Sequence, residues 1–232
     1  MYGKMRWNTP LSEDHAGLLI ERLAMAPGDD VLDLGCGWGE LLIRTIAQTP
    51  HTSGTGVDNA EWALDRGRAL ALERDVADRA KFVAHDASTW TSPADRVLCI
   101  GSAHAWGSSA AALRRLRGVV RPGGRLLFGD GCWEQPPSPA AAALFGEGVL
   151  SLAGLVDEVM ETGWHLLHLS TADQHEWDDF ESTWKAGRED WLSTNPRDPR
   201  AGEVRAKLAN QWTEYLGVYR GALGFAYLVL AR

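Results

Sequence analysis

The chain has 232 residues, a formal net charge of −8 and 45% apolar residues. A chain of this length can bury a full core without disulfides or structural metals, and it fits one large domain with or without a small addition. The acidic balance argues against a nucleic-acid partner, because nucleic-acid binding needs a basic face and no run of Lys or Arg is present.

Nothing in the sequence indicates export or a membrane. The first residues carry no apolar signal core, and no stretch approaches the ~18 continuous apolar residues of a membrane span. Cys36, Cys99 and Cys132 are widely spaced, form no C-x-x-C pair, and the histidines are scattered. We therefore expect a cytoplasmic protein, a monomer or homodimer, with no metal site, no membrane partner and no disulfide framework.

Short apolar runs alternate with amphipathic stretches, which is typical of a mostly parallel sheet with helices on both faces. Residues 1–11 precede the first amphipathic stretch, and we expect them to form an N-terminal lid segment. We predict strands at 31–34, 54–57, 81–84, 96–100, 125–128, 164–169 and 225–230, and helices at 12–25, 40–48, 60–73, 110–120 and 152–161. Three prolines within 132–139 predict a loop after the fifth strand, because each removes a backbone donor.

Residues 171–224 lie between the last two predicted strands and are too many for a hairpin loop. They contain two helical patterns, 179–192 and 202–219, separated by Pro196 and Pro199. We predict that this segment is an inserted helical cap, and that 12–170 and 225–232 form the main domain.

A glycine-rich loop joins the first strand to the next helix, in the order Asp33-Leu34-Gly35-Cys36-Gly37-Trp38-Gly39-Glu40. Glycines let the backbone approach a ligand closely, and a helix N-terminus offers free N–H groups. A dinucleotide fingerprint requires a glycine at position 40, where this chain has Glu40. The third glycine is Gly39 instead, so the spacing favours another nucleotide-like ligand.

The pattern resembles motif I of the class I S-adenosylmethionine-dependent methyltransferases, and the order of the later elements is similar as well. The resemblance implies an α/β, Rossmann-like sheet of seven mostly parallel strands and S-adenosyl-L-methionine as cofactor. It implies that Asp33 faces the donor's ammonium, that Asp58 binds the ribose hydroxyls, and that the segment around Asp86 reaches the adenine. The residues implied to hold the cofactor are Asp33, Gly35, Cys36, Gly37, Gly39, Asp58, Asn59, Asp86, Ala87, Ile100 and Gly101.

Each acid also has a purely structural interpretation: Asp33 can cap the glycine turn, and Asp58 can begin a helix as its N-cap. Three acids that follow three successive strands favour a ligand, since a doubly wound sheet binds ligands at that edge. A nicotinamide-dependent oxidoreductase is disfavoured by Glu40 and Asp86. A non-catalytic protein that binds S-adenosylmethionine stays open, because its cofactor residues would look the same.

His104 follows the fourth strand and is a candidate general base for an acceptor methylated at O, N or C. Its alternative role is a hydrogen bond to the loop backbone. His175, beside Glu176 at the start of the cap, is a second candidate. Family members that methylate nucleic-acid bases or glutamine carry an Asn/Asp-Pro-Pro-aromatic motif where this chain has Gly101-Ser102-Ala103-His104. Together with the charge, this difference points to a small-molecule methyl acceptor.

The chain has 11 Trp but only 5 Phe and 4 Tyr. Trp7, Trp106, Trp133 and Trp177 fall in the lid, in loops or in the cap, so we expect them to line the substrate pocket. Such a pocket suits an aromatic acceptor or a cationic amine. The alternative is that Trp177 and Trp184 pack the cap onto the sheet.

Overall fold

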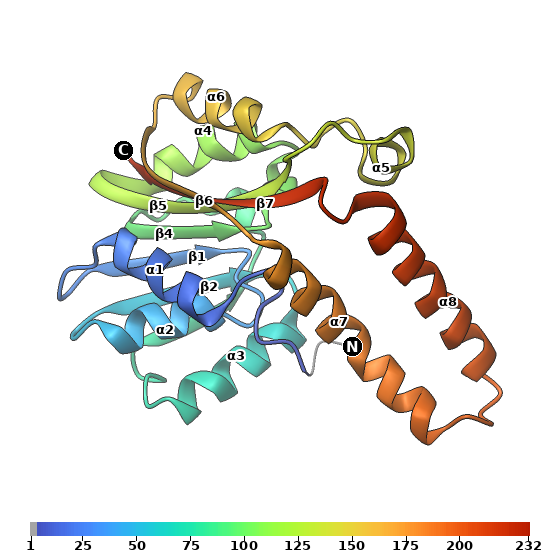
Figure 1. The fold of residues 1–232 in the computed structure, drawn as a ribbon. Coiled ribbons are helices and arrows are strands. Elements are labelled where there is room, and N and C mark those ends of the chain that lie inside the picture. The colour runs from blue at the N-terminus through green and yellow to red at the C-terminus, as the bar shows by residue number, and fades with distance from the viewer. Residues whose placement is uncertain (1–3) are drawn as a thin grey trace.

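The computed structural model describes residues 4–232 and shows a seven-stranded sheet with helices on both faces (Figure 1). Along the sheet the strands follow the order β3-β2-β1-β4-β5-β7-β6. The strands are β1 (Asp30–Leu34), β2 (Ser53–Asp58), β3 (Ala80–Ala84), β4 (Ala94–Ile100), β5 (Val120–Trp133), β6 (His165–Thr171) and β7 (Leu223–Ala231). The first five are parallel, and β7 runs antiparallel to both β5 and β6, which confirms the predicted fold class.

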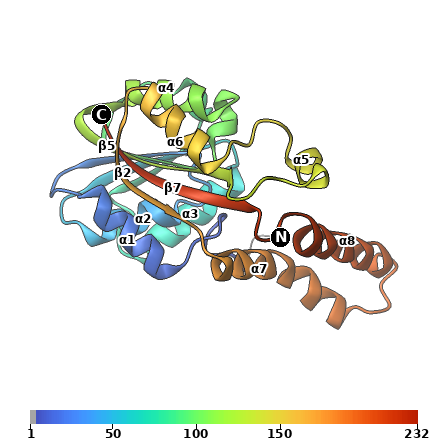
Figure 2. The same ribbon diagram turned by 45° about the horizontal axis from the view of Figure 1, so that its top comes forward.

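Two layers of helices enclose the sheet. The main helices are α1 (Glu13–Leu23), α2 (Glu40–Gln48), α3 (Glu61–Glu73), α4 (Ser109–Val119) and α6 (Leu152–Glu161). Helices α1, α2 and α3 cover one face, and α4 and α6 cover the other (Figures 1 and 2). The central strands are buried on both sides, as neighbouring Val97 and Leu98 illustrate with no exposed surface.

A helical insertion lies between the last two strands, as predicted. It consists of α7 (Gln174–Thr194), α8 (Ala201–Glu214) and a π-helical turn, η3 (Tyr215–Tyr219). The two helices form a hairpin that projects from the sheet (Figures 1 and 2). Helix α7 begins five residues earlier than the predicted 179 because Asp173 and Glu176 form a capping box there.

The region after the fourth strand differs from the prediction. Strand β5 begins at Val120, five residues before the predicted strand at 125–128, and it includes Cys132 and Trp133, which were expected in a loop. A short helix, α5 (Pro139–Phe145), then begins inside the proline-rich segment. Ser138 caps this helix, and Pro139 is tolerated in its first turn because no backbone donor is needed there.

Two short 3₁₀ helices follow β3 and β4 at the carboxyl edge of the sheet, η1 (Ala87–Thr89) and η2 (Ala103–Trp106). Residues 4–12, here called the N-terminal strap, precede α1 without regular structure. Residues 1–3 of the predicted lid lie outside the described part of the chain. None of the helices within residues 4–232 has the length and apolar character needed to cross a bilayer.

Candidate active site

A cavity of about 340 Å³ opens at the carboxyl edge of the sheet, within the size range of small-molecule sites. The loops after β1, β2, β3 and β4 and the N-terminal strap form its walls. Its lining residues are Arg6, Trp7, Asn8, Thr9, Leu11, Asp33, Gly35, Cys36, Gly37, Trp38, Glu40, Leu41, Asp58, Asn59, Asp86, Ala87, Ile100, Gly101, Ser102, His104 and Ala105. Of the residues implied to hold the cofactor, only Gly39 is not part of this lining.

The glycines of the loop after β1 serve different needs. Gly35 has a φ of 77°, and a side chain there would collide with the hydroxyl of Ser102. Gly37 has a φ of 54°, and a Cβ built there meets nothing within 4 Å. The backbone at Gly37 therefore borders open space in the cavity, where a ligand can approach closely. Gly39 is the N-cap of α2 and packs against Phe82.

Asp33 is a buried carboxylate on the cavity wall. The residue is 6% exposed, and its carboxylate accepts no hydrogen bond from any residue in the described part of the chain. Burial, together with the neighbouring charge of Asp58, raises the pKa of Asp33 to about 8. A buried carboxylate without a partner is costly, so this position fits a ligand that brings a cationic group.

Asp58 connects the glycine loop to the end of β2. Its Oδ2 accepts a hydrogen bond of 2.8 Å from the Gly37 amide, and its Oδ1 accepts one of 2.8 Å from the Ala60 amide. The N-cap of α3 is Ala60, so Asp58 does not fill the capping position considered above. Each carboxylate oxygen keeps a second lone pair that a ligand hydroxyl can use.

Asp86 lies on the cavity wall just after β3. Its Oδ1 accepts hydrogen bonds from the Ser88 amide at 2.9 Å and from the Ser88 hydroxyl at 2.7 Å, and these bonds lower the pKa of Asp86. The carboxylate is therefore held in place by the turn that begins η1, and it stays ionised near neutral pH.

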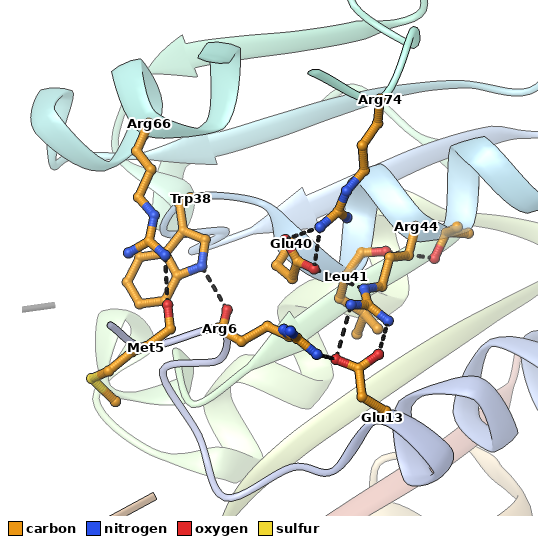
Figure 3. A network of polar contacts seen from close by, with 10 residues as sticks. Met5, Arg6, Glu13, Trp38, Glu40, Leu41, Arg44, Arg66 and Arg74 are labelled. Carbon is orange, nitrogen blue, oxygen red and sulfur yellow. Dashed lines mark hydrogen bonds and ion pairs between the residues drawn. The ribbon is translucent and has the colours of Figure 1, made fainter. Parts of the chain in front are cut away.

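Glu40 lies at the first turn of α2, where a dinucleotide-binding enzyme holds the pyrophosphate. Its side chain is 5% exposed and accepts hydrogen bonds from Arg44 Nε at 2.7 Å and Arg74 Nη2 at 2.8 Å (Figure 3). Glu40 therefore places a large, ion-paired side chain where a dinucleotide fingerprint has its third glycine, so the geometry disfavours a dinucleotide.

His104 is exposed in η2 and lines the cavity. Its ring forms no hydrogen bond with any residue of the described chain, so the expected alternative, a bond to the loop backbone, is not found. The buried carboxylate of Asp130 lies near enough to interact electrostatically with His104. His175, by contrast, is exposed on α7 and does not belong to the cavity lining.

Among the four tryptophans expected around the substrate, only Trp7 lines this cavity, with the Arg44 guanidinium 4.8 Å from its ring. Trp106 packs on the α4 side of the sheet, and Trp133 lies buried against α5 and β7. Trp177 packs between two apolar clusters at the base of the cap, as the packing alternative expected, whereas Trp184 lies within the cap.

Sequence reasoning missed Trp38 and most of the N-terminal strap as cavity residues. Trp38 lies inside the recognised loop, so its position alone was a usable signal.

Glu176, considered beside His175, instead accepts a hydrogen bond of 2.7 Å from the Ser12 amide at the end of the strap. Burial opposes ionisation of Glu176, but bonds from His15, Ser12 and Asp173 prevail and lower its pKa to about 2. Residues 4–232 contain no group of three or more side chains suited to hold a metal ion.

Comparison with known proteins identifies relatives of the chain. Residues 31–124 match the methyltransferase domain family. The chain is 32% identical to the uncharacterized protein YjhP of Escherichia coli K12, over 97% of this chain and 93% of that one. It is 34% identical to 27-O-demethylrifamycin SV methyltransferase of Amycolatopsis mediterranei, over 71% of this chain and 59% of that one.

Solved structures give the same result over the full length. An S-adenosylmethionine-dependent methyltransferase from Geobacter sulfurreducens, in complex with S-adenosyl-L-homocysteine, superposes with a TM-score of 0.90 and 31% identity. That superposition covers 99% of this chain and 94% of the other. Since the similarity in sequence and fold extends across nearly all of both chains, the protein belongs to the S-adenosylmethionine-dependent methyltransferases, and S-adenosylmethionine is its methyl donor.

Proposed function

We propose that the enzyme transfers the methyl group to a small-molecule acceptor and that His104 is the general base. The observation that carries this proposal is the position of His104. It is an exposed imidazole without a hydrogen-bond partner in the described chain, on the wall of the cavity that also contains Asp33, Asp58 and Asp86.

The acids along the cavity support a placement for the donor. Asp33 suits the donor's ammonium, because its buried carboxylate has no hydrogen-bond partner among the described residues. Asp58 suits the ribose hydroxyls, since its oxygens keep free lone pairs. Asp86 with Ala87 suits the adenine end. The open space beside Gly37 leaves room for the donor to pass along the backbone.

S-adenosylmethionine supplies an electrophilic methyl group, so the protein has to align the acceptor and exclude water. His104 can take a proton from an acceptor hydroxyl or amine, because a neutral imidazole has a nitrogen lone pair that accepts it. Asn8, Thr9 and Ala105 also line the cavity, and we expect them to contact the acceptor. We expect the N-terminal strap, which forms one wall of the cavity, to limit the access of water to this region.

Several features favour a small acceptor over a macromolecule. The relative from Amycolatopsis mediterranei is named for a small molecule, 27-O-demethylrifamycin SV. The net charge of −8 and the acidic cavity oppose a nucleic-acid substrate. All three cysteines are free, which suits the reducing cytoplasm that we propose for this enzyme.

The proposal is tested by following the transfer of labelled methyl groups from S-adenosylmethionine to a panel of small phenols, alcohols and amines. On the acceptor that is methylated, His104→Ala should lower turnover by roughly 10²- to 10⁴-fold, the usual contribution of a general base. Affinity for S-adenosylhomocysteine, measured by calorimetry, should stay close to wild type. His175→Ala is the matched control, because His175 is exposed outside the cavity.

Two results would contradict the proposal. Methylation of proteins or nucleic acids, with no small molecule of the panel accepted, would refute the acceptor class. Full turnover by His104→Ala on the true acceptor would refute the base assignment while leaving the donor site intact.

A further inference from the structure

The N-terminal strap (residues 4–12) forms one wall of the donor cavity through Arg6, Trp7, Asn8, Thr9 and Leu11. At its α1 end it is firmly held. The Tyr227 hydroxyl donates a hydrogen bond of 2.8 Å to the Pro10 carbonyl, and Glu176 accepts one of 2.7 Å from the Ser12 amide. These contacts come from β7 and α7, away from the donor-binding loops.

At its other end, the strap is bound by Trp38 of the cavity lining and by Arg66 of α3, which lies outside that lining. The Trp38 indole N–H donates a hydrogen bond of 2.7 Å to the Arg6 carbonyl, and Arg66 Nη2 donates one of 2.5 Å to the Met5 carbonyl (Figure 3). The Arg66 guanidinium also stacks 4.2 Å from the centre of the Trp38 ring. One aromatic–cation pair therefore satisfies two successive carbonyls of a segment that has no secondary structure to do so.

Trp38 and Arg66 come from elements that lie next to the proposed donor site. Trp38 lies between Gly37 and Gly39 in the loop that borders the donor, and it is 4% exposed. Arg66 comes from α3, the helix that follows Asp58. The strap is thus attached to the loop that borders the proposed ammonium site and to the helix that follows the proposed ribose site.

The attachment at this end, where the Met5 side chain is only 2% exposed, is partly buried and partly exposed. Besides the contacts of Trp38 and Arg66, it uses ion pairs of Lys4 with Asp190 and of Arg6 with Glu13, and the side chains of all four residues are between 44 and 62% exposed. Exposed ion pairs contribute little to stability, so closure of this end depends mainly on Met5 and on the contacts of Trp38 and Arg66. A donor in the cavity touches both walls, the loop and the strap, so its binding favours the closed arrangement.

We propose that Trp38 and Arg66 are positioning residues that couple donor binding to closure of the N-terminal strap. The donor fixes the glycine loop, and the loop presents the Trp38 N–H to the Arg6 carbonyl and the Trp38 ring to Arg66, which binds the Met5 carbonyl. The closed strap completes the wall with Asn8 and Thr9. Donor therefore binds before acceptor. This inference rests on the donor site and is independent of the acceptor and of His104.

The Arg6–Trp7 peptide bond provides a direct readout, because trypsin cleaves after arginine and the carbonyl of this bond is the one that Trp38 holds. Cleavage is followed by mass spectrometry on the full chain, with and without saturating S-adenosylhomocysteine. In the wild type, we expect the ligand to slow this cleavage at least several-fold. Calorimetry measures the affinity for the same ligand.

Trp38→Phe keeps a ring for Arg66 to stack on but removes the N–H donor. We expect it to lose most of the ligand-dependent protection and to bind S-adenosylhomocysteine roughly three- to tenfold more weakly, the loss that one hydrogen bond predicts. Arg66→Gln should act in the same direction, and its half-exposed position on α3 makes folding secure if Trp38→Phe is unstable. Trp191→Phe in the cap is the matched control and should behave as the wild type.

The inference is overturned if both variants keep the wild-type affinity and the wild-type ratio of cleavage rates with and without ligand. It is also overturned if cleavage accelerates equally in both conditions, because Trp38 and Arg66 would then only stabilise the strap. A wild-type protein that does not bind S-adenosylhomocysteine would instead contradict the donor site on which the proposed function depends.

Discussion

Asp33, which we propose as the partner of the donor's ammonium, should couple donor binding to proton release. Its ordinary pKa is 3.8, and burial raises the pKa to about 8 in the folded protein without ligand. A bound ammonium favours the carboxylate, so the pKa of Asp33 falls in the complex and a proton leaves. We expect donor affinity to rise with pH up to about 8 and to level off above it.

Calorimetry at pH 7 in buffers of different ionisation enthalpy measures this release, which we expect to approach about one proton per donor bound. Asp33→Asn should abolish it and weaken binding. The same pKa has the opposite consequence for the free protein. The folded state holds a proton that the unfolded state loses above pH 3.8, so the free energy of unfolding falls between pH 3.8 and about 8. Binding without proton release at pH 7 would rule out Asp33 as the ammonium's partner.

Asp58 holds the glycine loop and is proposed to bind the ribose. Two measurements on one substitution should separate these roles. Asp58→Ala removes the acceptor for the Gly37 and Ala60 amides and also the proposed ribose contact. We expect donor binding to weaken by about 1–3 kcal/mol through the lost charged hydrogen bonds. Thermal unfolding without ligand should show a smaller loss, from the loosened glycine loop. Unchanged affinity in calorimetry would mean that the ribose is held elsewhere.

At the scale of elements, the hydrophobic periodicity of the sequence predicted those helices and strands whose bounds it determines. Helix α2 has the predicted bounds, and all seven strands occur where apolar runs predicted them. The errors lie where another interaction decides the boundary. Helix α7 starts at its capping box rather than at the apolar pattern, and β5 continues to Trp133 because β7 pairs with it over that length. Helix α5 was missed because a proline cluster normally signals a loop.

The helical insertion contains a charge pair that no pattern predicted. Lys185 and Glu181 form an ion pair with side chains 1% and 5% exposed, and the Lys185 ammonium lies 4.6 Å from the centre of the Trp212 ring. The Tyr219 hydroxyl donates a hydrogen bond of 2.7 Å to Glu181. The pair thus joins α7 to α8 and to the π-helical turn.

Loss of one partner of this pair should be more harmful than loss of the charge on both. Lys185→Met leaves the Glu181 carboxylate buried without its cation, and we expect the free energy of unfolding to fall by about 3–5 kcal/mol. Adding Glu181→Gln keeps an acceptor for Tyr219 and removes the charge, so most of the loss should be recovered. Urea denaturation measures both. A double variant as unstable as the single one would show that the pair itself stabilises the cap.

At the scale of the molecule, the site combines parts that the sequence does and does not reveal. The acids Asp33, Asp58 and Asp86 could be predicted because parallel strands bring their carboxyl ends to one edge. The N-terminal strap was expected only as a lid, since its attachment depends on Trp38, Arg66 and Tyr227, which are distant in sequence. The positions of Trp106, Trp133 and Trp177 depend on how helices pack at the sheet edge, which composition does not determine.

Charge over the whole molecule makes a last prediction. The chain has a net charge of −8, and the carboxylates of Asp58 and Asp86 line its cavity. Asp33, with a pKa of about 8, is mostly protonated at pH 7, and Glu40 is paired with Arg44 and Arg74. S-adenosylmethionine carries a net positive charge through its sulfonium, whereas the product S-adenosylhomocysteine has none. A field of one sign steers an oppositely charged ligand, and salt screens it, since the Debye length falls from ~30 Å at 0.01 M to ~8 Å at 0.15 M. Stopped-flow fluorescence of Trp7 and Trp38 should show association of the donor slowing roughly two- to fivefold over this range. Association of the product should change little, and equal salt dependence of both ligands would mean that local contacts rather than the overall field govern entry.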